Sequence, residues 1–396
     1  MTHGEAFVSR RGAKRIRNGH LWIYRSDLLK IKASGGDVVS VYDESKNFIG
    51  KAFYSDASEI ALRFFTTRDE KISEEFWRKK VLQSFERRLG LLELSRLQQK
   101  FQSNALRFVN AEGDLIPSLI VDFYNGVFVI QTLSQGTEKL KNLFAEILKD
   151  IFAPEAIVER NDVSVRYLEN LELRSGILFG KEIREVLIEQ NGLKFRVSLL
   201  EGQKTGAFLD QRENYLVAKK FAKGKALDCF TFGGGFALNI AGVCHEVLAV
   251  DISEKAIKLA EENSRLNQIQ NVRFKIANVF DFLRELEKRG EKFDTIILDP
   301  PSFTKTRQSL ERAIKGYKEI NLRALKLLNP EGMLITCSCS QHFTEEIFLK
   351  ILQDASYDAK KKLQLIEKRT QSSDHPILLT VPETYYLKCF ILRLVS

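Results

Sequence analysis

Two short segments of the chain carry side chains that can do covalent chemistry. Asp299 follows an apolar run typical of a buried strand, and Pro300 and Pro301 then stiffen the backbone. Cys337 and Cys339 stand at the end of a second apolar run. We expect Cys339, just past its strand, to be the accessible thiol, and Cys337 to be packed deeper in the strand. An acid and a thiolate nucleophile can therefore meet at one edge of a sheet.

Both features also have a plain structural explanation. An aspartate can simply end a strand before a proline turn, and most cysteines are buried and inert. The proximity of Asp299 and Cys339, at the ends of neighbouring predicted strands, favours the catalytic interpretation. No two of the five cysteines have C-x-x-C spacing, which predicts free thiols and no metal site. The cysteines are Cys229, Cys244, Cys337, Cys339 and Cys389.

A glycine-rich turn, residues 233–235, directly follows another predicted strand. Asp251 ends the next strand, where a carboxylate can accept both ribose hydroxyls of an adenosine. Leu238 replaces the last glycine of the dinucleotide fingerprint, and Phe236 is bulky at the helix start. S-adenosylmethionine, which has no phosphate, tolerates both residues and is the favoured cofactor. A merely tight turn would explain the glycines but not Asp251.

Asn278, past the third strand, can hydrogen-bond the adenine amine, although asparagine is also an ordinary helix cap. The predicted cofactor contacts in this part of the chain all lie at strand ends or in the turns after them. They are Phe230, Thr231, Gly233, Gly235, Asp251, Ile252, Asn278, Val279 and Asp299.

A thiol and an acid beside a sulfonium cofactor are suited to methylation of cytosine C5. Thiolate addition to C6 makes C5 nucleophilic enough to take a methyl group, and Asp299 can support the ring at N3. Pro300 and Pro301 leave carbonyls free to face a substrate, and Phe303 joins them as a predicted substrate contact. No general base is identifiable from the sequence.

Two other functions compete with this hypothesis. Methylation of an exocyclic amine, such as guanine N2, needs no thiol but tends to use an aromatic residue directly after the prolines, where Ser302 stands. A non-catalytic RNA-binding or ribosome-assembly factor would explain the basic N-terminal segment. It would not explain Asp251, Asp299 and Cys339 at three strand ends.

The elements that must position these residues follow from periodicity. From about residue 225 strands and helices alternate, which predicts a doubly wound parallel α/β sheet. The predicted strands are 226–230, 247–251, 272–277, 295–298 and 333–337, and the predicted helices are 236–243, 253–267 and 279–289. Residues 1–70 are expected to form a β-rich domain with strands at 38–42 and 48–54, residues 71–185 a small α+β domain, and residues 186–396 the third domain. Asn-Gly pairs at 125–126 and 191–192 predict tight hairpins.

The charge of the chain allows a nucleic-acid partner. The formal net charge is +9, and the basic segment 10–17 stands beside the aromatic residues of segment 19–24. Contacts to RNA are predicted for Arg11, Lys14 and Arg15; the alternative is a solvated basic turn. A helix capped by Ser73 is expected to run to about Lys100, with a basic face that is either solvated or an RNA-facing ridge; this face carries Arg78, Lys79, Lys80, Arg87 and Arg88. No apolar stretch is long enough for a membrane span, and no secretion signal is evident, which predicts a cytoplasmic protein.

With these residues in hand, the chain resembles the bacterial 23S rRNA (cytosine-5) methyltransferase family of the large subunit methyltransferase I type. The shared blocks are residues 202–212, 229–236, 299–303, 315–321, 338–340 and 374–376. Two positions depart from the family pattern: Gly233 replaces a more usual threonine, and Asn278 stands where many relatives have aspartate.

The resemblance implies an architecture and a set of roles. It implies an N-terminal RNA-binding PUA domain, a central α+β domain and a C-terminal Rossmann-like class I methyltransferase domain. It also implies S-adenosylmethionine as cofactor, 23S rRNA as substrate, Cys339 as nucleophile and a homodimer. The block that closes over the cofactor supplies four further predicted contacts, Lys204, Thr205, Phe208 and Asp210.

Overall fold

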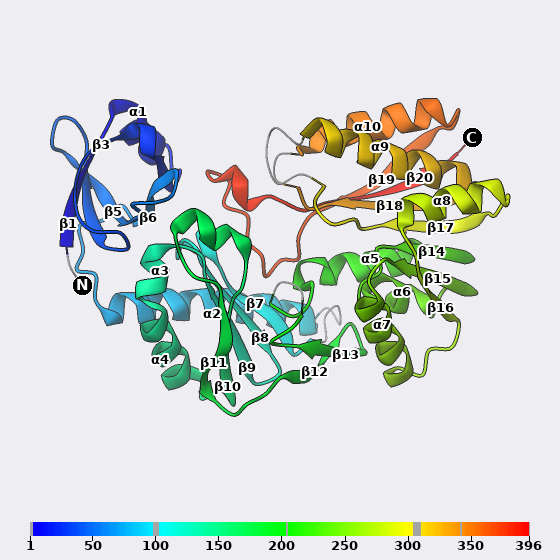
Figure 1. Ribbon diagram of the computed structural model, residues 1–396, viewed down its shortest axis with the longest axis horizontal. Helices are drawn as coiled ribbons and strands as arrows, with labels where there is room; N and C mark the ends of the chain where they lie inside the picture. The colour runs from blue at the N-terminus through cyan, green and yellow to red at the C-terminus, as the bar shows by residue number, and fades with distance from the viewer. Residues whose placement is uncertain (1–2, 98–102, 203–204, 304–309, 341–342, 396) are drawn as a thin grey trace. The chain divides into compact units, whose positions relative to one another are not determined.

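A computed structural model describes residues 3–97, 103–202, 205–303, 310–340 and 343–395 (Figure 1). The chain divides into two compact units, and each is described by itself. The first unit is formed by Met1–Ile188, Val197–Leu209 and Ser373–Thr384; the second is formed by Glu189–Arg196, Asp210–Ser372 and Tyr385–Ser396.

The first unit begins with a six-stranded sheet in the order β2-β6-β5-β4-β1-β3. Its strands are β1 (His3–Val8), β2 (Trp22–Tyr24), β3 (Leu28–Lys32), β4 (Val38–Tyr42), β5 (Phe48–Tyr54) and β6 (Ile60–Thr66). The two strands predicted here, β4 and β5, are confirmed and pair antiparallel. The basic segment is not a turn, however, because Arg10–Arg17 forms helix α1. Ser9 caps this helix by accepting the Gly12 N–H at 3.1 Å, and Ala13 and Ile16 bury its apolar face.

A five-stranded sheet in the order β11-β10-β9-β8-β7 follows in the same unit. Its strands are β7 (Ala105–Asn110), β8 (Leu119–Tyr124), β9 (Val127–Thr132), β10 (Ala156–Asn161) and β11 (Arg174–Gly180), and its helices are α2 (Glu74–Leu97), α3 (Gln135–Lys139) and α4 (Lys141–Phe152). Asn125 and Gly126 have φ angles of +44° and +94°, so the predicted β8–β9 hairpin turn is confirmed.

Helix α2 begins after Ser73 as predicted, but its basic face is not simply solvated. Arg88 is 2% exposed and forms two hydrogen bonds of 2.6 Å with the buried carboxylate of Asp114. Lys80 donates to the Phe65 carbonyl at 2.9 Å. Both interpretations of this face, solvated or RNA-facing, are therefore wrong for Arg88. Its planar guanidinium satisfies a buried carboxylate, a pairing that helical periodicity cannot reveal.

The second unit is built on a seven-stranded sheet in the order β16-β15-β14-β17-β18-β20-β19. The strands are β14 (Lys225–Cys229), β15 (Glu246–Asp251), β16 (Val272–Ile276), β17 (Phe293–Leu298), β18 (Leu328–Ser338), β19 (Leu363–Arg369) and β20 (Lys388–Leu394). The five strands from β16 to β18 are parallel, which confirms the predicted doubly wound core. The antiparallel pair β19 and β20 was not predicted.

Helices cover both faces of this sheet. Figure 1 shows α5, α6 and α7 on one side and α8, α9 and α10 on the other. Their bounds are α5 (Arg212–Phe221), α6 (Gly235–Ala241), α7 (Glu254–Leu266), α8 (Val279–Lys288), α9 (Leu310–Leu327) and α10 (Glu345–Asp358). The hairpin strands β12 (Glu185–Gln190) and β13 (Leu193–Ser198) form a separate two-stranded sheet with the predicted turn at Asn191 and Gly192.

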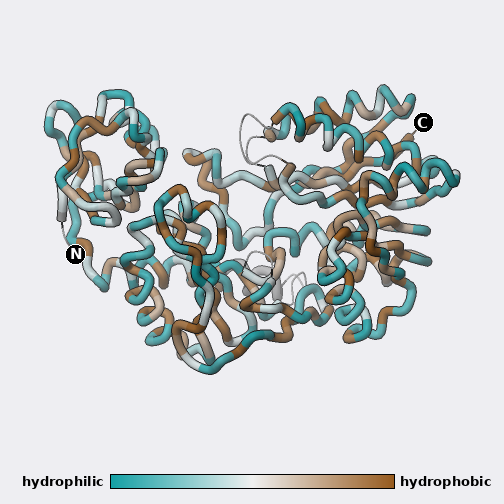
Figure 2. Tube along the Cα trace, viewed as in Figure 1, coloured by the Kyte–Doolittle hydropathy of each residue, from teal (hydrophilic) through white to brown (hydrophobic). Residues whose placement is uncertain are grey.

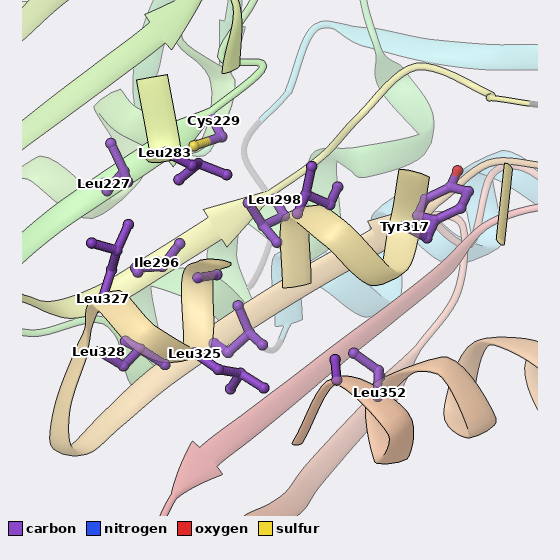
Figure 3. Close-up of a cluster of buried hydrophobic side chains, with 14 of the residues drawn as sticks. Leu227, Cys229, Leu283, Ile296, Leu298, Tyr317, Leu325, Leu327, Leu328 and Leu352 are labelled. Carbon is purple, nitrogen blue, oxygen red and sulfur yellow. The ribbon is translucent and has the colours of Figure 1, made fainter. Parts of the chain in front are cut away.

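Apolar residues recur along the strands of the seven-stranded sheet, while apolar and polar residues alternate along the helices that cover it (Figure 2). Figure 3 shows the core beneath α8 and α9, where leucines of β17 and α9 pack together and Tyr317 lies at one end of the cluster. No helix among the described residues is both long and apolar enough to cross a bilayer. The domain limits at residues 70 and 185 stay predictions.

Candidate cofactor and catalytic site

The carboxyl end of β14 opens into a turn with an unusual backbone. Phe230, Phe232 and Gly234 have φ angles of +64°, +48° and +86°, and α6 begins at Gly235. A phenylalanine at positive φ is uncommon, and such strain gathers at functional sites. The Thr231 N–H donates to the Val250 carbonyl at 3.0 Å, which ties the turn to the adjacent strand β15.

The glycines of this turn have different structural reasons. Gly234 adopts a left-handed conformation that favours glycine. A Cβ atom at Gly235 would stand 2.5 Å from the Tyr215 ring, so packing alone demands a glycine there. Gly233 has neither constraint, because a Cβ atom on it would meet nothing closer than 3.3 Å. The predicted cofactor contacts of Gly233 and Gly235 stay predictions.

Asp228, the next-to-last residue of β14, was not among the predicted site residues. Its Oδ2 accepts from the Thr231 hydroxyl at 2.6 Å and from the Ala237 N–H at 3.0 Å. Its Oδ1 is buried with no hydrogen-bond partner among the described residues. Burial raises the pKa of Asp228 to about 7, and the charges of Asp299 and Asp251 add to the shift. A buried carboxylate oxygen aimed at no protein donor fits a cationic ligand group, and the ammonium of S-adenosylmethionine is such a group.

Asp251 lies where the sequence predicted it, at the end of β15 beside the turn. Its Oδ2 accepts from the Phe232 N–H at 3.0 Å, and its Oδ1 accepts from the Ser253 N–H at 2.9 Å. These bonds fix the orientation of a half-buried carboxylate and leave lone pairs on both oxygens. Such a carboxylate can accept a ribose diol, the role predicted for it.

The three remaining predicted cofactor contacts on this side of the sheet differ in environment. Asn278 caps α8, with Oδ1 accepting from the Phe280 N–H at 3.0 Å, so its alternative role as a helix cap is confirmed. Val279 is 3% exposed and packs in the core, which leaves only its backbone available to a ligand. Ile252 is 66% exposed and offers an apolar surface next to Asp251.

Asp299 directly follows β17 and is held by a relay of amides. Its Oδ1 accepts from the Gln211 Nε2 at 2.9 Å. The Asn214 Nδ2 donates to the Gln211 Oε1 at 2.6 Å and to the Thr370 carbonyl at 3.1 Å. Asn214 therefore fixes which end of the Gln211 amide faces Asp299. Gln211 lies in a block that the family resemblance marked, but no sequence signal assigned it a partner.

Cys339 follows β18, the strand beside β17, as the sequence predicted. A hydroxyl cluster joins the two loops: the Ser302 Oγ lies 2.8 Å from the Ser340 Oγ, and the Tyr317 hydroxyl lies 3.3 Å from the Ser340 Oγ. Burial raises the pKa of Tyr317, and the charges of Cys339 and Asp299 raise it further. Cys339 and Asp299 therefore both interact electrostatically with Tyr317.

The two candidate nucleophiles differ in accessibility. Cys339 is half-buried, whereas Cys337 is fully buried opposite Cys389 in the β18–β20 ladder. Burial raises the pKa of Cys337 well above the ordinary range. The interpretation of Cys337 as a packed residue is confirmed, and all five cysteines are free as predicted.

The segment after Asp299 combines exposed and packed residues. Pro300 is buried and Pro301 is exposed. Phe303 is half-buried, with its ring centroid 4.7 Å from that of Tyr317 and 5.7 Å from that of Phe280. The ring that was predicted to contact substrate therefore also belongs to an aromatic cluster of the core.

The block from 204 to 210 gives mixed results for the predicted cofactor contacts. Lys204 lies outside the described residues. Thr205 is buried in the first unit, where its hydroxyl bonds to the Asp122 carboxylate and lies 3.0 Å from the Tyr124 hydroxyl. Asp210, in the second unit, accepts from the Tyr386 hydroxyl at 2.8 Å. The half-buried Phe208 and these two residues stay predicted cofactor contacts.

Helix α1 displays the basic side chains that were predicted to contact RNA. Lys14 is exposed, and Arg11 is exposed while its Nε donates to Asp27 at 2.8 Å. The Arg15 guanidinium lies over the Tyr24 ring, 4.7 Å from its centroid. The cations of α1 and the Tyr24 ring of β2 thus lie together, an arrangement that suits RNA.

Comparisons with known proteins agree with this architecture. A family model described as PUA-like domain matches residues 7–67, and one described as S-adenosylmethionine-dependent methyltransferase matches residues 112–388. A structure described as a methyltransferase complexed with SAH shares the fold, with a TM-score of 0.85 and 20% sequence identity over 98% of this chain and 99% of that one. The fold and the site thus define an S-adenosylmethionine-dependent methyltransferase that carries a PUA-like domain.

Curated relatives specify the family. The chain is 41% identical over 391 residues to ribosomal RNA large subunit methyltransferase I of Tolumonas auensis, covering 96% of each. It is 38% identical over 390 residues to the protein of that name from Aliivibrio fischeri, covering 96% of this chain and 97% of the relative. The chain belongs to the ribosomal RNA large subunit methyltransferase I family. Its predicted cofactor, S-adenosylmethionine, is confirmed.

Proposed function

We propose that the protein methylates C5 of a cytosine in 23S rRNA through a covalent adduct between Cys339 and C6 of the base. The observation that carries this proposal is the bond between Ser302 and Ser340, which holds the Asp299 loop beside the Cys339 loop. Cys339 is half-buried, whereas the rival thiol of Cys337 is buried. The names of the curated relatives support an rRNA substrate.

The chemistry follows from the poor nucleophilicity of cytosine C5. The Cys339 thiolate adds to C6, and Asp299, in its protonated form, donates to N3 and stabilises the charge that develops in the ring. S-adenosylmethionine supplies an electrophilic methyl group when bound. Loss of the C5 proton to a base then allows Cys339 to leave as a thiolate and restores the aromatic ring.

The cofactor residues have separable roles in this proposal. Asp251 would hold the ribose hydroxyls, and Asp228 would balance the cationic amino acid end. Gly233 and Gly235 with Phe230 and Thr231 form the turn that approaches the cofactor. Ile252, Asn278 and the Val279 backbone would surround the adenine.

Recognition of RNA is proposed for helix α1 of the PUA-like domain. Arg11 and Lys14 would contact phosphates, while Arg15 and Tyr24 would contact a base or the backbone. Pro300, Pro301 and Phe303 would border the target base. We also propose a cytoplasmic homodimer, which size-exclusion chromatography with light scattering would test.

The decisive experiment replaces the nucleophile. Cys339→Ala should abolish methyl transfer to 23S rRNA while leaving S-adenosylmethionine affinity, measured by calorimetry, within about twofold. The matched control is Cys244→Ala, which removes a buried thiol from the other end of the sheet. RNA that contains 5-fluorocytidine should trap the wild-type protein covalently, and the Cys339 variant should form no adduct. Full methylation by the Cys339 variant would refute the assignment.

Mass analysis of the modified nucleosides separates the two methyl-transfer chemistries. The proposal predicts 5-methylcytidine in rRNA incubated with the protein and cofactor. The rival chemistry, exocyclic-amine methylation, would give a methylated guanosine instead and would need no thiol. Bisulfite sequencing of rRNA from cells with and without the protein would identify the target cytosine.

A further inference from the structure

A buried lysine lies beside the proposed nucleophile. Lys388 is the first residue of β20, and the antiparallel ladder places it opposite Ser338, the last residue of β18. It is only 2% exposed. Lysine is almost never fully buried without a partner, because removing an ammonium from water is costly. The register of two strands has therefore brought a positive charge to the segment that carries Cys339.

The hydrogen bonds of Lys388 anchor its ammonium at this segment. Nζ donates to the Ser340 carbonyl at 3.0 Å and to the Tyr386 carbonyl at 3.2 Å. The first of these acceptors belongs to the residue directly after Cys339. Both acceptors are neutral, and an ammonium has three protons to donate. The two bonds fix the position of the charge without neutralising it.

Cys339 and Glu345 both interact electrostatically with the Lys388 ammonium, and Glu345 already forms a salt bridge with another lysine. Burial lowers the pKa of Lys388 to about 8, while the charges of Cys339 and Glu345 oppose the shift. Glu345, on α10, forms a salt bridge with Lys368 of β19 and accepts from the Tyr385 hydroxyl at 3.0 Å. Since Lys368 largely balances Glu345, Cys339 is left as the anion that Lys388 can stabilise.

We propose that the ammonium of Lys388 stabilises the thiolate form of Cys339 and so prepares the nucleophile before RNA binds. Lys388 is a positioning residue in this scheme, because it acts through Cys339 and contacts no reacting atom of the substrate. The inference rests on the proposed function for its biological meaning. Its physical content, a thiolate favoured at neutral pH, concerns the free protein alone.

Three other ionisable groups among the described residues near this segment do not supply a positive charge. Tyr317, from α9, stays a neutral hydroxyl because burial raises its pKa. Asp299, beyond β17, is a carboxyl group and supplies no positive charge. Tyr385 is also neutral, since its pKa is raised to about 12 by burial and by Glu345. Lys388 supplies the positive charge that these three groups do not.

The proton and the electrons balance in this scheme. The Cys339 thiol gives its proton to solvent, and the charge of the Lys388 ammonium favours the negative sulfur that remains. When the sulfur electron pair forms the bond to C6, the displaced π electrons become available at C5 for the methyl group. The lysine keeps its proton throughout, so replacing the lysine changes the readiness of the thiolate and not the stoichiometry.

The test measures the pH dependence of Cys339 alkylation in the free protein. Iodoacetamide reacts with the thiolate, so the rate at each pH reports the thiolate fraction, and tandem mass spectrometry assigns the label to Cys339 rather than Cys337. In the wild-type protein the midpoint should lie below the ordinary thiol value of about 8.5. Lys388→Gln, which keeps a donor but removes the charge, should raise the midpoint by about one pH unit. Lys388→Arg should keep it near the wild-type value.

Rates at a single pH would understate the effect. A rise of one pH unit in the alkylation midpoint lowers the thiolate fraction at pH 7 about tenfold. The more basic thiolate is roughly threefold more nucleophilic, so the net alkylation rate falls only about threefold. The midpoint is therefore the readout. Lys350→Met is the matched control, because it removes an exposed lysine of α10 that pairs with Asp354 and not with Glu345, and its midpoint should match that of the wild type.

Two outcomes would overturn the inference. The first is a wild-type midpoint at or above about 8.5, which needs no variant and decides the matter even if Lys388→Gln fails to fold. The second is a folded Lys388→Gln protein, shown by normal S-adenosylmethionine binding, with an unshifted midpoint. The nucleophile assignment fails separately: a shifted midpoint together with full methylation by Cys339→Ala would keep the charge pairing and reject the adduct chemistry.

Discussion

The hydrogen bond from Gln211 to Asp299 can decide which of two predicted roles Asp299 plays. Asp299 was predicted both to support the base and to contact the cofactor. Gln211→Met removes the 2.9 Å donor to the Asp299 Oδ1 and replaces it with an apolar chain of similar length. Asn214 loses one acceptor but keeps its bond to the Thr370 carbonyl at 3.1 Å. The change therefore acts on the orientation of the Asp299 carboxyl group and also removes the side-chain hydrogen bond between Gln211 and the buried Cys337.

The size of the effect follows from the type of bond. A hydrogen bond to a charged group contributes about 1.5–3 kcal/mol. If that whole contribution is expressed in the transition state, kcat falls about 10- to 150-fold. Gln211 is 2% exposed, so solvent does not readily replace the lost donor. We expect the unfolding free energy to fall by only about 1 kcal/mol, because the glutamine side chain is exchanged for an apolar group of similar volume.

The assay separates chemistry from cofactor binding. Single-turnover methylation of rRNA gives the rate of the chemical step, and calorimetry gives the affinity for S-adenosylmethionine. A base-supporting Asp299 predicts a slower step with unchanged affinity, whereas a cofactor-binding Asp299 predicts weaker affinity. Asn214→Ala, which frees the Gln211 amide to rotate, should give a smaller change of the same kind. A Gln211→Met protein within twofold of wild type in both measurements would refute the positioning role.

Three other predictions test separate features of the molecule. The pKa of Asp228 is raised to about 7, so the cofactor-free protein should lose stability as pH rises from the ordinary aspartate range towards 7. Because a cationic cofactor favours the carboxylate form, calorimetry should show the affinity for S-adenosylmethionine falling below pH 7. Asp228→Asn should remove that pH dependence. Arg88→Met leaves the buried Asp114 without its two 2.6 Å hydrogen bonds and should lower the free energy of unfolding by about 3–5 kcal/mol in denaturant titrations. A loss under about 1 kcal/mol would contradict the conclusion that Arg88 and Asp114 form a buried salt bridge. Lys14→Glu on α1 should weaken rRNA binding and reduce the slope of log affinity against log salt concentration by about 0.7–0.9. The control is Lys30→Glu on β3, where the lysine is also exposed, and it should change neither quantity. Equal effects of the two variants would argue against α1 as the RNA-binding face.

The sequence predicted the parts of the fold that repeat regularly. Apolar runs of strand length alternating with helical periodicity predicted the parallel sheet from β14 to β18, because each pattern reflects burial on both faces of the sheet. The hairpin at Asn125 and Gly126 was predictable from the positive φ angles that these residues tolerate. The positions of Asp251, Asp299 and Cys339 at strand ends followed from the same reasoning, since parallel strands present their carboxyl ends at one edge.

The features that escaped prediction depend on contacts between distant residues. Helix α1 was missed because a run of arginine and lysine shows little apolar periodicity, although Ser9 could have signalled a cap. The burial of Arg88 depends on Asp114, which no pattern within α2 reveals. The structure of the glycine-rich turn also differs from what its sequence suggests. The positive φ angles of non-glycine residues lie at Phe230 and Phe232, and residue 235 must be a glycine because the Tyr215 ring packs against it. The sequence pattern draws attention to the glycines and not to the two phenylalanines beside them.

The nucleophile illustrates this division between local sequence and distant partners. A cysteine just past a strand is recognisable from the sequence around it, but a thiol at that position is not yet a thiolate. The charge needed to make it one arrives through the antiparallel pairing of β20 with β18, which sets Lys388 opposite Ser338. A slip of one residue in that register would turn Lys388 to the other face of the sheet. The reactivity of Cys339 would then depend on the C-terminal strand as much as on its own loop, and variants that disturb β20 should lower alkylation at Cys339 before they affect cofactor binding.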